Sequence, residues 1–432
     1  MSEPVLGLTA WFHKLKLDTS AWKSSKDFRL LFTSSAIGQF GSMITYVTIP
    51  FQVAQITGSY VAVGIIGVLE IIPLIVFGIW GGAIADTANR KTIIVSCELA
   101  LMALTALLFY NSLLANPHLW ILYFVAFSYA ICDGLQGPSL EALLPQVVPM
   151  SHLASASAMN SLKRNASSIV GPALGGIIAA TLGSAFAYGI DVATYVVSFI
   201  LLLKLSHQST SASGQKVDVA LLFSGFHYVR GRKDILGTYA IDIAAMLFAF
   251  PNALFPFIAI EFEAPWALGL LYASMSIGSL LATVTSGWTT HIHRQGKAIV
   301  LAAIAWGVAI SIAGLSPNIY FVLFALMCAG AADMVSGLFR TLVWNTTIPL
   351  DMRGRLAGIE MLSYSVGPQL GQIRSTFFAR AFGLRVSLVF GGALCIASAS
   401  ALASSLKSMW EFDDRTNEHA VHERKIRAIN TD

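Results

Sequence analysis

The chain has 432 residues, of which 56% are hydrophobic and only 12% are charged. Soluble domains carry about a quarter charged residues, so this composition excludes an ordinary soluble enzyme and indicates burial in lipid. The net charge of +4 is not concentrated in a basic patch of the kind that binds nucleic acid. We therefore expect membrane lipid, and no nucleic acid, among its partners.

Apolar runs of about 20 residues recur along the sequence, which is the length that a helix needs to cross a hydrocarbon core of about 30 Å. Helices are required because an open strand edge leaves backbone groups unsatisfied in lipid. The runs predict an all-α membrane protein with twelve transmembrane helices. The expected spans are residues 28–54, 61–83, 92–114, 119–139, 153–181, 184–204, 235–259, 268–290, 297–315, 318–344, 355–380 and 385–406.

The distribution of Lys and Arg agrees with this layout, because cytoplasmic loops of membrane proteins carry an excess of these residues. All but five of the 27 Lys and Arg fall in or beside the N-terminal segment, the connections after even-numbered spans, and the tail. We therefore expect both termini in the cytoplasm. The exceptions are Lys163, Arg164, Arg374, Arg380 and Arg385.

The spans divide the chain into five parts. Residues 1–27 form a cytoplasmic segment, residues 28–204 a first six-helix bundle, and residues 235–406 a second one. Between the bundles, residues 205–234 form a cytoplasmic linker whose spaced apolar residues predict an amphipathic helix. Residues 407–432 form a cytoplasmic tail.

The two bundles carry related residues in the same order, which indicates an internal repeat. Repeated halves imply a substrate site near the bilayer midplane between them, reached by alternating access. The matches are Asp133, Gly137 and Pro149 with Asp333, Gly337 and Pro349 at an offset of 200 residues, Gly64 and Gly82 with Gly269 and Gly287 at 205, and Gly171, Pro172, Leu174 and Gly175 with Gly367, Pro368, Leu370 and Gly371 at 196.

The connection between the second and third spans contains Gly82, Asp86, Arg90 and Lys91. A carboxylate at one helix end beside two cations could latch the cytoplasmic side in one state. The pattern resembles the loop signature of the major facilitator superfamily, although Asn89 stands where that signature has a glycine. The alternative is an ordinary turn with the charge bias of a cytoplasmic loop.

In the fifth span, Gly171, Pro172, Gly175 and Gly176 let a neighbouring helix approach closely and allow a bend. This run is similar to the signature of exporters in the same superfamily, and simple helix packing is its alternative interpretation. Further pieces resemble the enterobactin-exporter and macrolide-efflux branch. They are Asp133-Gly134, Leu143-Leu144-Pro145, Asn160-Ser161-Leu162, Arg164, Tyr188-Gly189, Gly269-Leu270-Leu271-Tyr272-Ala273 and Arg353-Gly354-Arg355.

This resemblance implies the major facilitator fold and a proton-driven exporter of the bacterial cytoplasmic membrane.

Charged residues inside membrane spans are costly and usually face a cavity or a partner. We expect Asp133 and Asp333 to couple or gate transport, with Glu70 and Glu360 as further proton sites. Fixed ion pairing is the alternative for each carboxylate. Helices 3, 6, 9 and 12 lie outside the cavity in this fold, which assigns Glu98 and Asp191 to packing.

Residues of both signs and several polar or aromatic groups are expected to line the substrate cavity. Arg164 matches Glu360 at an offset of 196 residues, so a cation and a carboxylate would flank the cavity and suit an anionic or zwitterionic substrate. Fixed internal pairing and packing are the alternatives. The expected lining residues are Arg164, Arg374, Asp242, Gln39, Tyr46, Tyr129, Asn252 and Phe255.

The leading hypothesis is a secondary exporter of a siderophore-like metabolite or an amphipathic drug, exchanging a small molecule for protons. A lipid or lysolipid transporter and an importer of the same fold are alternatives. A membrane-embedded enzyme would need clustered catalytic residues, and the nine His are scattered. Without a phosphate-binding loop or metal-ligand spacing, we expect no cofactor, no metal and no catalytic site, and we expect a monomer.

Overall fold

The computed structural model describes residues 18–206 and 227–429. Within helices, this description leaves out the side chains of residues 79, 81–83, 85–87, 350, 351, 353–355, 357–364 and 428–429. The described chain is helical and contains no strand. Most of the predicted linker, residues 207–226, lies outside the described residues, as does its predicted amphipathic helix.

The first half contains six long helices after the short helix α2 (Ser20–Ser24). Their bounds agree with the predicted spans for α7 and nearly so for α8, whereas α3, α4 and α6 run beyond them, because polar ends that leave the hydrocarbon still continue the helix. The helices are α3 (Lys26–Thr57), α4 (Tyr60–Thr87), α5 (Arg90–Leu113), α6 (Leu119–Val147), α7 (Leu153–Thr181) and α8 (Ser184–Leu203), with a 3₁₀ turn η1 (Met150–His152) before α7.

The second half repeats this order, with one helix broken. Pro251 lacks a backbone N–H and disfavours a helical residue before it, so the predicted span 235–259 divides into α10 (Lys233–Ala249), η2 (Asn252–Leu254) and α11 (Phe255–Glu261). The remaining elements are α12 (Ala267–Val284), η3 (Ser286–His291), α13 (Gln295–Leu315), α14 (Ile319–Thr347), α15 (Leu350–Phe382) and α16 (Leu384–Ser405), followed by α17 (Lys407–Trp410) and α18 (Glu418–Ile429).

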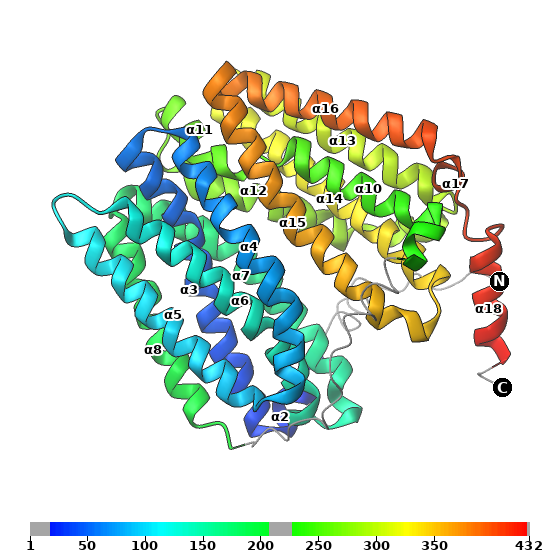
Figure 1. Cartoon of the computed structure of the whole chain (residues 1–432), viewed down its shortest axis with the longest axis horizontal. Coiled ribbons are helices and arrows are strands. Elements are labelled where there is room, and N and C mark those ends of the chain that lie inside the picture. The colour runs from blue at the N-terminus through cyan, green and yellow to red at the C-terminus, as the bar shows by residue number, and fades with distance from the viewer. Residues whose placement is uncertain (1–17, 207–226, 430–432) are drawn as a thin grey trace, which may run out of the picture.

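The packing order shows that the halves are related. In the first half, neighbouring helices follow the order α4, α6, α5, α8, α3, α7, and in the second half the order α12, α14, α13, α16, α10, α15. The main contacts between the halves are α4 with α15 and α7 with α12. Since α4 corresponds to α12 and α15 to α7, these two contacts are equivalent to each other. The fold therefore consists of two pseudo-symmetric six-helix bundles, which meet near α11 and diverge toward α2 and α18 (Figure 1).

Two turns repeat the same backbone conformation. Gly183 and Gly383, 200 residues apart, both have φ +93° immediately before α8 and α16. This region is strained for residues that carry a Cβ, so glycine is required at both turns. Pro149 and Pro349 also match, with φ −56° and −57° before the helical turns that follow them.

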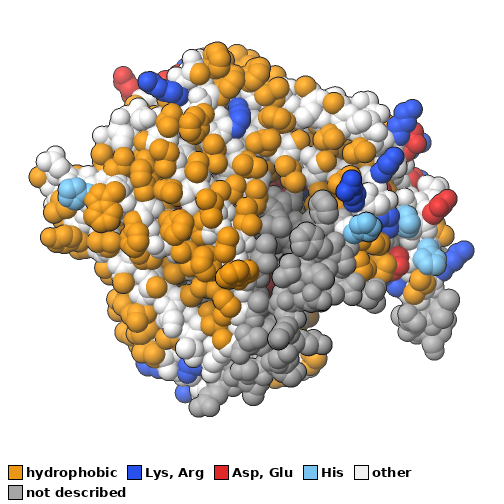
Figure 2. Space-filling view, in the orientation of Figure 1, with side chains coloured by type: hydrophobic (Ala, Val, Ile, Leu, Met, Phe, Trp, Pro, Cys, Tyr) orange, Lys and Arg blue, Asp and Glu red, His pale blue; other side chains and the backbone are white. Residues whose placement is uncertain are grey.

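Apolar surface surrounds the bundles, as expected for a chain in lipid. Nine of the described helices are long and apolar enough to cross a membrane. The helices α3, α7 and α15 fall outside this set, and α7 and α15 are the helices of each half that pack across the boundary. Figure 2 shows hydrophobic side chains over most of one face, with charged side chains mainly toward its edges.

The two described ends of the chain lie on one face, here called the terminal face. On the first half, Ala21 of α2 donates its N–H to Ser155 Oγ near the start of α7, at 3.3 Å. On the second half, Arg427 of α18 donates to the carbonyl of Ile348 between α14 and α15, at 3.3 Å. The turns at Gly58, Gly183 and Gly383 lie on the opposite face.

Close packing at the α7–α12 contact predicts a large effect of a single methyl group. A Cβ on Gly176 would collide with the backbone of Gly269, which cannot move aside as a side chain can. We expect Gly176→Ala to lower the free energy of unfolding by about 1–3 kcal/mol, measured by unfolding of the detergent-solubilised protein. Gly137→Ala is the matched control, because a Cβ there meets no atom within 4 Å. Equal stability of the two variants would contradict this packing.

Candidate functional site

Two cavities meet inside the described part of the molecule. The larger, about 630 Å³, is lined by residues of α3, α5, α6, α7 and α8. The smaller, about 170 Å³, lies between the halves and is lined by α3, α4 and α6 on one side and η2, α12 and α15 on the other. Ser42, Met43 and Asp133 line both cavities, which are therefore adjacent and are together called the chamber.

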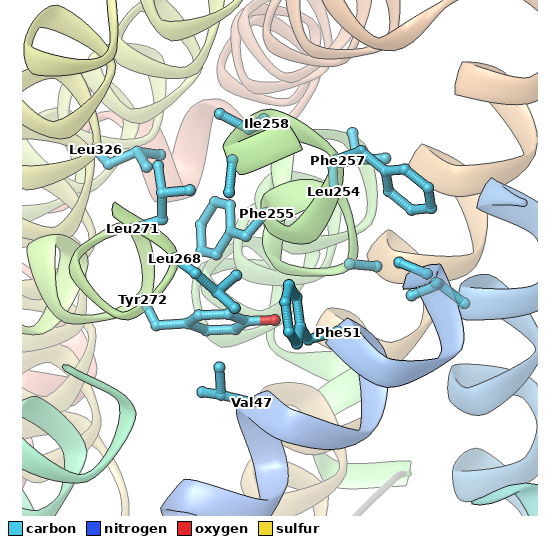
Figure 3. Packing of buried hydrophobic residues seen from close by; sticks show 14 of the residues in the cluster. Val47, Phe51, Leu254, Phe255, Phe257, Ile258, Leu268, Leu271, Tyr272 and Leu326 are labelled. Atoms are coloured by element: carbon cyan, nitrogen blue, oxygen red, sulfur yellow. The ribbon is translucent and has the colours of Figure 1, made fainter. Parts of the chain in front are cut away.

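Apolar packing closes this chamber toward the opposite face. The rings of Tyr60 and Phe257, from different halves, have centroids 4.2 Å apart, and those of Tyr46 and Tyr272 are 6.0 Å apart. Figure 3 shows Val47 and Phe51 of α3 beside residues of η2, α11 and α12 in the same buried cluster. The larger cavity extends the other way, toward the terminal face, where Phe28 lies in the first turn of α3 and Ser157 lies near the start of α7.

Asp133 and Glu70 lie in the chamber. Asp133 projects from α6 into both cavities, and Glu70 of α4 lines the smaller one. Gln369 of α15 donates to Glu70 Oε2 at 2.9 Å, and Gln372 donates to Gln369 Oε1 at 3.3 Å. This chain of hydrogen bonds joins the halves at the wall of the chamber, so the charge of Glu70 bears directly on their contact.

The second pair of predicted carboxylates is placed differently. Asp333 lies on α14, the counterpart of α6, but it is half-buried and lines neither cavity. The side chain of Glu360 in α15 lies outside the described residues. The repeat therefore places the backbone of Asp333 symmetrically without giving its side chain the same surroundings as Asp133.

Arg164 and Gln39 line the larger cavity. Arg164 is exposed there and donates to Ser161 Oγ at 3.4 Å. Beside it, Lys163 donates to Ser35 Oγ at 2.7 Å and lies over the ring of Phe32 at 5.7 Å. These two cations give the α7 wall of the cavity a positive charge.

Arg374 points away from the chamber, contrary to the expectation that it lines the cavity. Its guanidinium donates to the carbonyl of Phe248, to that of Leu247 at 3.4 Å, and to that of Ser387 at 3.2 Å. The carbonyls of the last turn of a helix lack partners within the helix and attract cations. Arg374 therefore satisfies the end of α10, where Pro251 interrupts the helix.

Asp242 is also placed outside both cavities. It forms an ion pair with Arg340 of α14 and is 7% exposed. Arg340 falls near the end of the predicted span 318–344, and α14 continues to Thr347 and leaves it half-buried. The pair could not be predicted from the sequence, because hydropathy does not show that α10 and α14 bring these two side chains together.

Of the predicted polar and aromatic lining residues, Tyr46, Tyr129 and Asn252 line the smaller cavity. Phe255 does not, because it is fully buried at the closed end and packs edge-on against Tyr272, with ring centroids 4.8 Å apart. The break in α10 explains this difference, since it turns α11 away from the cavity.

The predicted latch is described only in part. The side chains of Gly82 and Asp86 lie outside the described residues. Arg90 donates to the carbonyl of Ala142 in α6 at 3.2 Å, and Lys91 donates to the carbonyl of Leu205 after α8. Asn89 caps α5 by accepting from the N–H of Thr92 at 3.2 Å, which gives a local reason for an amide at this position.

The glycines of α7 serve two contacts. A Cβ on Gly171 or Gly175 would collide with Met43 or Ile44 of α3, in the same half. Gly176 faces Gly269 in the other half, and Pro172 is buried within α7. The motif therefore brings α7 close to helices on both sides at the closed end of the chamber.

Two related six-helix bundles, with one polar cavity in the first bundle and an adjacent one between the bundles, define a multi-pass membrane transporter of the major facilitator type. Residues 19–431 match the family described as transmembrane secretion effector. The chain belongs to this family of the major facilitator superfamily.

Relatives and solved structures agree with this assignment. The chain is 26% identical over 360 residues to the enterobactin exporter EntS of Citrobacter koseri and to that of Escherichia coli O1:K1 / APEC, covering 82% of this chain and 86% of each relative. The fold resembles a transporter of the POT family (12% identity, TM-score 0.71, 89% of this chain and 97% of that one). It also resembles a bacterial homologue of the lysosomal transporter Spinster (15%, 0.65, 91% and 95%).

The ion pair in the second half predicts a double-mutant result. Removing one partner of a buried pair leaves an uncompensated charge and costs about 3–5 kcal/mol, whereas removing both costs less. We expect Asp242→Asn and Arg340→Met each to destabilise the solubilised protein strongly, and the double variant to recover part of the loss. The exposed pair Arg385 and Glu261 is the control, where single changes should cost at most about 1 kcal/mol. Additive losses at Asp242 and Arg340 would argue against their coupling.

Proposed function

We propose that this protein is a secondary active transporter of the bacterial inner membrane that exports a siderophore-like metabolite or an amphipathic drug in exchange for protons. The observation that carries the proposal is the chamber, which is closed at one face by contacts between the halves and is lined by carboxylates that include Asp133 and Glu70. Both termini are cytoplasmic in this proposal, in keeping with the bias of Lys and Arg toward the terminal face.

Alternating access follows from where the halves touch. With the terminal face in the cytoplasm, the structure is open inward, since the packed contacts of Tyr60 with Phe257 and Gly176 with Gly269 lie toward the other side. Rocking one half on the other would break these contacts and close the cytoplasmic side. The contacts are small and mainly apolar, so they can separate without leaving a buried charge unpaired.

Proton coupling rests on the surroundings of the chamber carboxylates. Desolvation favours the neutral form of a carboxyl, and water or a cation favours the charged form, so a site that alternates between these settings takes up and releases a proton. Glu70 accepts its hydrogen bond from Gln369 of the other half, and its protonation would change a contact between the halves. Asp333 and Glu360 remain candidates for a related role in the second half.

The substrate class is suggested by the larger cavity and by the relatives. Arg164 and Lys163 offer positive charge to an anionic group, while the half-buried Phe32 offers apolar surface to an aromatic one. The relatives are named enterobactin exporters, and enterobactin is accordingly the first substrate to test. Ethidium is a suitable amphipathic drug for comparison.

Transport into inverted membrane vesicles with an imposed pH gradient tests the proposal. We expect gradient-driven uptake of enterobactin or ethidium, reduced roughly a hundredfold by Asp133→Asn and by Asp333→Asn, because each removes a group that transfers a proton. Arg164→Ala should raise the KM about tenfold by removing one charged hydrogen bond. Asp413→Asn in the tail is the control. Full uptake by Asp133→Asn, Asp333→Asn and Arg164→Ala would refute these site assignments. The absence of any gradient-driven uptake by the wild type would refute the proton coupling.

A further inference from the structure

Glu98 is a buried carboxylate that the proposed mechanism does not use. It lies on α5, a helix that packs against α6 and α8 rather than between the halves, and it is 5% exposed. Nevertheless it lines the larger cavity together with Asp133, Gln136 and Gly38. A side chain expected to serve packing thus reaches the chamber.

The two carboxyl oxygens of Glu98 have different hydrogen-bond surroundings. Gln136 of α6 donates to Oε2 at 2.8 Å. Oε1 is buried and has no hydrogen-bond partner among the described residues. A buried acceptor without a donor costs free energy, more so if the group is charged. The arrangement therefore supports one oxygen of the carboxyl and leaves the other to a proton, a cation or water from the cavity.

Gly38 of α3 provides the space that Glu98 occupies. A Cβ on Gly38 would lie 3.1 Å from Glu98 Oε1 and 3.4 Å from Ser198 Oγ, which is tighter than ordinary van der Waals contact. The missing side chain opens a gap in the α3 wall, and through this gap a residue of the second layer of helices reaches the cavity. The position of α5 in the bundle does not by itself reveal this gap.

No cation compensates Glu98 among the charged residues that line this cavity. From α7, Lys163 donates to Ser35 and Arg164 donates to Ser161. From α6, Asp133 and Glu141 add further carboxylates. The lining residues of α3 and α8 are uncharged, and their polar groups are hydroxyls and one amide. A lone ionised carboxyl in a membrane bundle is costly, and such residues commonly mark proton pathways.

We propose that Glu98 is a proton-exchange site of the first half, connected to the chamber through the gap at Gly38. The proton resides on Oε1 when the cavity is dry at this point. When water enters, the O–H bond breaks, the proton passes to water, and the carboxylate keeps the hydrogen bond from Gln136. Only the use of this proton in transport rests on the proposed function, because the exchange itself needs no substrate.

Infrared difference spectroscopy of the full-length protein in lipid, between acidic and alkaline buffer, tests this site. Wild type should lose the C=O band of a buried protonated carboxyl as the pH rises, and Glu98→Gln should lack one such band. Glu141→Gln is the matched control, since Glu141 lines the same cavity but is exposed. The Glu141→Gln variant should keep the band. An unchanged spectrum in Glu98→Gln would overturn the proposal.

A second variant separates proton exchange from a packing role and covers the case in which Glu98→Gln does not fold. Gln136→Leu removes the donor to Oε2, so the charged form loses support and the band should persist to higher pH, by about one pH unit for a loss near 1.4 kcal/mol. A midpoint that does not move would overturn the proposal. Because no substrate is present, a protein that exchanges this proton but fails to transport would contradict the proposed function alone.

Discussion

The close approach of the two halves at one end is the constraint on which the rest of the structure depends. Gly176 and Gly269 let the backbones of α7 and α12 touch, and the rings of Tyr60 and Phe257 pack beside this region of contact between the halves. In lipid there is little hydrophobic force between helices, so small residues that permit tight packing decide where helices associate. Contact at one end leaves the halves apart at the other, and the chamber is the result.

Charged groups inside the bundles have different surroundings in the two halves. Asp242 pairs with Arg340, and Arg374 satisfies the carbonyls at the broken end of α10. These arrangements stabilise the second half and hold its charges away from the chamber. In the first half, Asp133 and Glu98 face the cavity without a cation of this kind among the described residues. The described charged side chains of the two halves thus have different surroundings, although the backbone is nearly symmetric.

The pseudo-symmetry therefore applies to helices and turns more than to side chains. Gly183 and Gly383 share one backbone conformation because the same turn must be made twice. Asp133 and Asp333 share a helix position, yet only Asp133 reaches the chamber. The α7–α12 contact is made by glycines, whereas the equivalent α4–α15 contact includes Gln369 and Glu70. Two matching contacts between the halves thus differ in chemistry.

The sequence by itself determined the twelve helices, their division into related halves and the family, because apolar length, charge bias and repeated glycines are properties of local segments and their order. It also identified Asp133, Glu70 and Arg164 as residues that the structure places in the cavities. Only the tertiary structure decided that Arg374, Asp242 and Phe255 lie away from the chamber and that Glu98 reaches it. The direction of a side chain depends on which helix lies opposite and on gaps such as Gly38, and neither is encoded within a single span.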